Sequence, residues 1–224
     1  NLRYEIDRIE PEIATIQDFS DSLGILRVAE KCNGSGDCRK PVSAGGTMCP
    51  SYRATKNEKD TTRARANALR EFLTNSDKIN KFDYEALKEV FDLCLSCKAC
   101  ASECPSNVDI AALKAEFLYQ YQKDNKPSFR TKLFAENVKY NKLGSVAPFL
   151  TNIILNNGLV KKTIGIATER SIPKLYKTTL RKWYKRNFKR LHNQQFKNGS
   201  VYLFCDEFTN YYDVKIGIDA AELL

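Results

Sequence analysis

Four closely spaced cysteines dominate the middle of this 224-residue chain: Cys94, Cys97, Cys100 and Cys104, the last followed at once by Pro105. The C-x2-C-x2-C-x3-C-P spacing is that of a ferredoxin-type loop, in which the first three thiolates converge on one [4Fe–4S] cluster. The fourth cysteine of such a run usually binds a second cluster nearby, and the proline prevents the chain from coiling back into helix. The run therefore predicts a second cysteine motif elsewhere in the chain.

An incomplete second motif lies upstream. Cys32 and Cys38 take the first and third positions of the same template, Ser35 stands where the second cysteine belongs, and Cys49, followed by Pro50, is the displaced fourth position. Exchange of the fourth ligands gives one cluster with the predicted ligands Cys94, Cys97, Cys100 and Cys49. The other cluster lacks one thiolate, and its predicted ligands are Cys32, Cys38 and Cys104. At the gap, a Ser35 alkoxide, a water, a [3Fe–4S] cluster and loss of the cluster all remain open.

Zinc and disulfides are the competing uses of paired cysteines. Structural zinc sites also use cysteines two residues apart, but zinc has no need of three consecutive C-x2 steps, and Cys-Pro at both fourth positions is typical of ferredoxins. Seven of the eight cysteines lie between Cys32 and Cys104 in groups that suit metal, which favours a reducing compartment. The eighth, Cys205, ends an apolar run, and it is either a small buried side chain or the missing ligand.

Positive charge is concentrated in one segment. The formal net charge is +9, but residues 161–197 contain twelve Lys or Arg and one acid, so this segment carries +11 and the remainder −2. Interleaved aromatic residues suit an acidic protein face or peripheral contact with an anionic membrane surface. A solvated helical face, or a strap over the negative cluster domain, is the simpler alternative. Nucleic acid is disfavoured because no readout motif accompanies the charge.

No apolar run reaches transmembrane length, and we expect a cytoplasmic protein that contacts at most the inner face of the membrane. The one histidine, His192, has no carboxylate or serine partner in view that would indicate acid–base or triad chemistry. The chain begins at Asn1 and ends within a helical pattern, so we expect a fragment of a longer protein.

Apolar periodicity and capping residues predict a mainly α-helical fold. In the first half, the expected elements are a strand over 2–6 and helices over 63–73, from about 83, and from 107 or 109 to 125. Residues 128–160 predict one or two further helices, with the apolar run 149–155 in the core. A buried strand over 201–205 followed by a helix over 213–224 predicts the start of an α/β domain.

These elements predict four consecutive parts. Residues 1–30 end a preceding domain, and residues 31–127 form an α-helical ferredoxin-type domain for two clusters. Residues 128–199 form a basic helical connecting segment, and residues 200–224 begin a truncated, cysteine-rich α/β domain.

Several segments carry a family resemblance when they are taken together: residues 31–40 (KCNGSGDCRK), 48–55 (MCPSYRAT), 62–66 (TRARA), 104–109 (CPSNVD), 113–118 (LKAEFL), 170–175 (RSIPKL) and 204–211 (FCDEFTNY). They resemble the iron–sulfur half of fused bacterial FAD-linked D-2-hydroxyacid dehydrogenases. Glycolate oxidase and the anaerobic glycerol-3-phosphate dehydrogenase carry related cluster subunits.

The resemblance implies that a flavin domain precedes this chain, with residues 1–30 as its tail. FAD there would oxidise a D-2-hydroxy acid such as D-lactate, glycolate or D-2-hydroxyglutarate to the 2-oxo acid. This chain would relay the electrons to a quinone or carrier protein and supply no catalytic acid, base or nucleophile. Arg39 and Lys40 would raise the potential of the incomplete cluster. In this family the first motif typically lacks its middle cysteine, as at Ser35.

The alternative is a separately encoded electron-transfer subunit, as in heterodisulfide-reductase-like or glycerol-3-phosphate dehydrogenase complexes.

Overall fold

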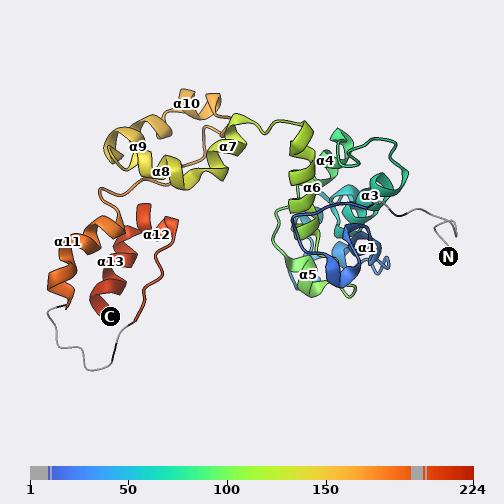
Figure 1. Cartoon of the computed structure of the whole chain (residues 1–224), viewed down its shortest axis with the longest axis horizontal. Coiled ribbons are helices and arrows are strands. Elements are labelled where there is room, and N and C mark those ends of the chain that lie inside the picture. The colour runs from blue at the N-terminus through green and yellow to red at the C-terminus, as the bar shows by residue number, and fades with distance from the viewer. Residues whose placement is uncertain (1–9, 11, 193–198, 200) are drawn as a thin grey trace. The chain divides into compact units, whose positions relative to one another are not determined.

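The computed structural model describes residues 10, 12–192, 199 and 201–224, and it divides into two compact units, residues 1–126 and 127–224 (Figure 1). Within the described ranges every regular element is a helix, which confirms the prediction of a mainly α-helical fold. The strand predicted over residues 2–6 lies outside the described residues.

The first unit packs its helices around one apolar core. Its α-helices are α1 (Ile25–Glu30), α2 (Pro50–Thr55), α3 (Thr62–Asn75), α4 (Glu85–Asp92), α5 (Ala99–Glu103) and α6 (Ile110–Asp124). Short 3-10 turns lie at Ser20–Ser22, Asp37–Arg39, Val42–Ala44 and Glu58–Asp60. The centre of the core is formed by the fully buried side chains of Leu69, Leu73, Leu87, Phe91, Leu113 and Phe117.

Caps fix where the long helices begin. The Thr61 side chain accepts a hydrogen bond from the N–H of Ala64 at the start of α3, and Asp109 does the same for Ala112 at the start of α6. Each cap satisfies one backbone donor that the first helical turn leaves free. α3 and α6 therefore begin at or within a residue of the positions that the sequence predicts.

An aromatic contact joins α4 and α6, the two helices that flank the second cysteine motif. The rings of Phe91 in α4 and Phe117 in α6 stack with centroids 5.0 Å apart and planes 16° apart. α4 ends at Asp92, two residues before Cys94, and α6 begins shortly after Cys104. The stack thus holds both flanks of the second cysteine motif on one rigid core.

Residues that precede the first cysteine also belong to this unit. The buried carboxylate of Glu116 in α6 accepts hydrogen bonds from the backbone N–H groups of Ile16 and Gln17, both at 3.0 Å. Gln120 donates to the carbonyl of Ala14 at 2.8 Å. Four side chains of α1 are buried in the same core. The structure therefore places residues 12–30 in the same unit as the cysteine motifs.

The second unit consists of α7 (Phe129–Ala135), α8 (Asn137–Gly144), α9 (Pro148–Asn156), α10 (Gly158–Thr163), α11 (Leu180–His192), α12 (Glu207–Tyr211) and α13 (Val214–Leu223). Its buried apolar side chains are few: Leu175, Leu180, Tyr211 and Val214. A Cβ at Gly217 would lie 2.3 Å from a methyl group of Leu180, so α11 and α13 approach closely at this glycine.

Two predictions for this unit are wrong. The apolar run 149–155 forms α9, which has no buried residue, and Phe149 is 75% exposed. Residues 201–205 form no strand, and Tyr202 is fully exposed. A strand needs a partner for its backbone hydrogen bonds, and the described residues supply none here. None of the described helices is long and apolar enough to cross a membrane.

Candidate metal centre

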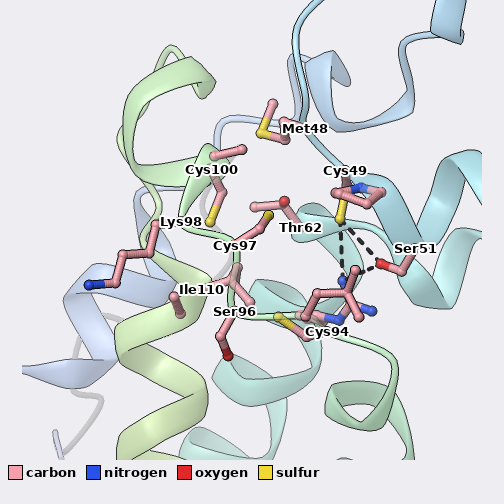
Figure 2. A pocket seen from close by; sticks show the side chains of 15 residues that line it. Met48, Cys49, Ser51, Thr62, Cys94, Ser96, Cys97, Lys98, Cys100 and Ile110 are labelled. Atoms are coloured by element: carbon pink, nitrogen blue, oxygen red, sulfur yellow. Dashed lines mark hydrogen bonds between the residues drawn. The ribbon is translucent and has the colours of Figure 1, made fainter. Parts of the chain in front are cut away.

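Four cysteines from separate stretches of the first unit line one small cavity. Cys94 follows α4, Cys97 lies in the next loop, Cys100 is in α5, and Cys49 precedes α2. Figure 2 shows their side chains pointing toward the same space, Cys49 from the segment before α2 and the other three from the segment that connects α4 to α5. The structure thus brings together the four cysteines that the sequence assigns to one cluster.

The loop between Cys94 and α5 is shaped by left-handed residues and by one lysine. Ser96 and Lys98 have positive φ angles of 50° and 62°, which fold the loop tightly around the cavity. The ammonium group of Lys114 in α6 donates to the carbonyls of Cys94 at 2.7 Å and Asp92 at 3.3 Å. These carbonyls close α4, where a cation is favourable. Burial lowers the pKa of Lys114.

Two helix N-termini point at cysteine sulfurs. Burial raises the pKa of the Cys100 thiol, and hydrogen bonds from the N–H groups of Ile110 and Ala111, at the start of α6, oppose that rise. At Cys38 burial again raises the pKa, and the N–H of Arg63 in the first turn of α3 opposes it. The positive end of a helix favours a thiolate over a thiol. Sequence reasoning found both helix starts but not their orientation toward sulfur.

Arg65 in α3 is the principal residue that sequence reasoning missed. Its side chain is fully buried, and its Nη1 lies 3.4 Å from Cys49 Sγ. The same nitrogen donates to the Ser51 hydroxyl at 3.1 Å and to the carbonyl of Asp60 at 2.7 Å. A signal was present, because Arg65 stands four residues before Leu69 on the buried face of the helix. A charge at a core position needs partners.

Glu103 at the end of α5 fastens the segment before Cys49. Its carboxylate accepts hydrogen bonds from the N–H groups of Thr47, at 2.8 and 3.0 Å, and Met48, at 2.9 Å. These bonds from Met48 and Thr47 lower the pKa of Glu103. A Cβ on Gly46 would lie 2.6 Å from Glu103 Oε2, so a side chain at this position would force the carboxylate to move away from its hydrogen-bond donors. Glu103 thereby connects the two cysteine motifs.

The incomplete motif lies around the 3-10 turn Asp37–Arg39. Cys38 is buried in that turn. Burial is the main cause of the raised pKa of its thiol, and the nearby Cys32 and Cys49 raise it further. Cys32 and Cys104 are half-buried and pack against the same core. Ser35 is exposed, and its N–H is bonded to Asn33.

The two cations beside the incomplete motif are both paired. Arg39 lies 3.3 Å from Glu58, and Lys40 lies 2.7 Å from Asp37. Each pair offsets part of the positive charge. The structure therefore gives less support than the sequence to the expectation that Arg39 and Lys40 raise the potential of this cluster.

The chemistry of the complete site fits an anionic iron–sulfur cluster. Arg65 Nη2 and Asp60 Oδ1 are buried and have no hydrogen-bond partner among the described residues. These two atoms face each other at 3.8 Å, while Nη1 of the same guanidinium lies 3.4 Å from Cys49 Sγ in the wall of the four-cysteine cavity. A buried cation with a donor on a cysteine sulfur suits an anionic cluster. Among the described residues no three Cys, His, Asp or Glu side chains gather closely enough for a single metal ion. The ligands of a cubane each bind a different iron, and so they stand further apart.

The second unit contains the remaining residues that the sequence singled out, Cys205 and the basic segment. Cys205 is half-buried, and its Sγ lies 3.9 Å from the carbonyl of Asp206. The basic side chains of α11 are all exposed, and they are Arg181, Lys182, Lys185, Arg186, Lys189 and Arg190. In the described part of the chain only Arg190 of these forms an ion pair, with Glu222 at 2.7 Å.

Comparison with known families agrees with the site. Residues 31–109 match the family described as "4Fe-4S dicluster domain". The first unit is therefore an α-helical domain for iron–sulfur clusters of the [4Fe–4S] type, which confirms the predicted cofactor.

Curated proteins with similar sequences indicate which iron–sulfur proteins this chain resembles. The chain is 28% identical to D-2-hydroxyglutarate dehydrogenase of Escherichia coli, over 88% of this chain and 24% of that protein. The proteins of the same name from Haemophilus influenzae and Pantoea ananatis are 25% and 26% identical over 84% and 88% of this chain. The chain spans about a quarter of the length of these relatives. No solved structure matches it.

Proposed function

We propose that this chain is the electron-relay part of an FAD-linked D-2-hydroxyacid dehydrogenase. The observation that carries the proposal is the convergence of Cys49 with Cys94, Cys97 and Cys100 in a chain similar to D-2-hydroxyglutarate dehydrogenases. Since the relatives are about four times longer, the oxidation of the hydroxy acid at FAD belongs to a part of the protein outside this chain. D-2-hydroxyglutarate is the substrate that the relatives' name supports.

The residues of the first unit hold and shield the cofactor. Bound clusters supply one-electron transfer, and their potentials depend on ligands, hydrogen bonds to sulfur and burial. Cys49, Cys94, Cys97 and Cys100 are the proposed ligands of one cluster, and the N–H groups at the start of α6 reach one of these sulfurs. No side chain here is proposed as a catalytic acid, base or nucleophile.

The incomplete motif is proposed to hold the second cluster. Its proposed ligands are Cys32, Cys38 and Cys104, and Ser35 stands at the open position. The support is the burial of Cys38, the N–H bond it receives from α3, and the match to a dicluster family. The exposure of Ser35 leaves space for water to complete the coordination.

The basic face of α11 is proposed to dock the electron acceptor. Its exposed cations suit an acidic carrier protein or the anionic inner surface of the cytoplasmic membrane, where quinone resides. A Lys185→Glu variant tests this role, with Lys59→Glu in the first unit as the charge-matched control. The proposal expects slower transfer to the acceptor and weaker sedimentation with phosphatidylglycerol vesicles for the α11 variant alone. Equal behaviour of both variants and the wild type would refute it.

The central test is anaerobic purification of the chain with iron and sulfide counts, together with EPR of oxidised and reduced samples. Two full cubanes give about eight irons per chain, whereas a [3Fe–4S] cluster gives fewer and an EPR signal in the oxidised state. Bound zinc without iron would overturn the proposal. In the full-length protein, D-2-hydroxyglutarate should reduce the clusters faster than D-lactate or glycolate. Failure of all three acids to reduce them would exclude the dehydrogenase assignment.

A further inference from the structure

Arg65 occupies a position where a charged side chain is costly. It is fully buried in the apolar core, on the face of α3 that also carries Leu69 and Leu73. A guanidinium stays protonated in proteins, so burial does not remove its charge. An isolated charge in such a place costs several kcal/mol unless partners compensate it. The contacts of Arg65 therefore indicate what the charge is for.

Those contacts join the cavity wall to three helical segments. Nη1 faces Cys49 Sγ, the Ser51 hydroxyl and the carbonyl of Asp60, and Nε donates to the carbonyl of Val90 in α4 at 3.0 Å. Ser51 Oγ is itself 3.3 Å from Cys49 Sγ. The dashed lines in Figure 2 mark these contacts of Cys49 Sγ. Cys49 is thus held by a cation and a hydroxyl together.

The countercharge of Arg65 is loosely placed. Asp60 is also buried, and its Oδ1 lies 3.8 Å from Arg65 Nη2, beyond hydrogen-bond distance. The other carboxylate oxygen accepts a hydrogen bond from Thr55 at 2.7 Å. Nη2 has no hydrogen-bond partner among the described residues, although it belongs to a residue that lines the cavity. Arg65 therefore carries a positive charge at the wall of the cavity, and Asp60 balances it through an ion pair without a hydrogen bond.

We propose that Arg65 is a positioning residue that raises the reduction potential of the cluster bound by Cys49, Cys94, Cys97 and Cys100. Nη1 holds the Cys49 thiolate, and the guanidinium places a fixed positive charge beside the cluster. This inference rests on the proposed function, because it requires a cluster in that cavity.

The direction in which Arg65 shifts the reduction potential follows from its charge. One-electron reduction adds a negative charge to the cluster, and a fixed cation in a buried site stabilises that charge far more than it would in water. Hydrogen bonds to the ligand sulfur act in the same direction. Asp60 opposes Arg65 through its own negative charge. Removal of the cation should therefore lower the potential, and removal of the anion should raise it.

The test is an EPR-monitored redox titration of the reconstituted chain. The relevant signal is identified as the one that is lost in Cys97→Ala. Arg65→Met should lower the ratio of reduced to oxidised cluster at least tenfold at fixed potential, a shift of about 59 mV for one electron. Arg65→Lys keeps the charge and should shift the ratio less. Asp60→Asn should shift it in the opposite direction.

Arg63→Met is the matched control. Arg63 is in the same helix, but its guanidinium pairs with Glu58 and its backbone N–H faces Cys38 of the other motif. It should leave the identified signal at the wild-type potential. If Arg65→Met does not fold, Arg65→Lys and Asp60→Asn still decide the matter, because a merely structural role predicts no opposite shifts.

The inference is overturned if Asp60→Asn and the folded Arg65 variants titrate like the wild type, or if Arg63→Met moves the signal as much as Arg65→Met. These outcomes differ from failure of the proposed function. In that case the wild-type chain itself would bind no iron and give no signal to titrate.

Discussion

Phe117→Ala tests whether α6 is held on the core as the structure shows. The ring of Phe117 is fully buried, stacks on Phe91, and lies 5.6 Å from Tyr121 and 6.5 Å from Phe82 between ring centroids. Replacing a buried phenylalanine with alanine costs about 3–5 kcal/mol through lost burial and the cavity left behind. That range includes the free energy lost with the aromatic contacts. We therefore expect Phe117→Ala to lower the free energy of unfolding by about 4 kcal/mol, a large share of the stability of a typical domain.

Urea unfolding of the full chain under reducing conditions measures this loss. With a urea dependence of about 2 kcal/mol per molar, the midpoint of the first unit should fall by about 2 M. Far-ultraviolet circular dichroism follows both units. Tryptophan fluorescence, excited selectively over tyrosine, follows the second unit alone, because the single tryptophan of the chain, Trp183, lies in α11. The circular dichroism transition should therefore shift while the fluorescence transition stays in place.

Two controls bracket the result. Ile79 is fully exposed in the same unit, and Ile79→Ala should change stability by about 0.5 kcal/mol or less. Gly217→Ala places a Cβ against Leu180 in the second unit and should shift the fluorescence transition instead. A Phe117→Ala midpoint within 0.5 M of wild type, on the same urea scale, would refute the packing argument. So would an equal shift of both transitions.

Two further predictions concern the link between the cysteine motifs. Because the pKa of Glu103 is lowered from its ordinary 4.5, its stabilising effect is present above that pH and is lost as the pH falls through the folded-state pKa. Lowering the pH from neutral should therefore increase iron release more in the wild type than in Glu103→Gln, and the loss of visible absorbance measures this release. Identical pH profiles of the two proteins would contradict the prediction. Gly46→Ala should destabilise the first unit more than Gly36→Ala, by urea unfolding. Both glycines have positive φ, a strain of about 1–2 kcal/mol for alanine, but only Gly46 faces Glu103. Equal effects would argue against the Glu103 contact.

The sequence predicted the first unit well because its signals are local. Cysteine spacing indicated the cluster chemistry, and the Thr61 and Asp109 caps indicated where α3 and α6 begin. The spacing also predicted the crossing of Cys49 to the second motif, and the structure places these cysteines around one cavity. Capping and ligand spacing depend on residues a few positions apart, so a single sequence contains them.

What the sequence did not predict depends on distant contacts. The hydrogen bonds of Glu103 to Thr47 and Met48 join residues more than fifty positions apart. The role of Arg65 depends on Cys49, Asp60 and Val90 at once. The strand predicted over 201–205 was wrong because β-propensity describes a surface that fits a sheet, and the described residues offer no neighbouring strand. The run 149–155 was apolar enough for a core, but α9 leaves it exposed.

The most direct test of the central claim is which cysteines share a cluster. Single alanine variants at Cys49, Cys97 and Cys38 are reconstituted and compared by EPR and iron content, with Cys205→Ala as the control in the second unit. The crossed arrangement predicts that Cys49→Ala and Cys97→Ala lose the same signal, that Cys38→Ala loses the other, and that Cys205→Ala loses neither. If Cys49→Ala instead loses the signal that Cys38→Ala loses and keeps the one that depends on Cys97, the cavity in this structure is not a cluster site of the proposed kind.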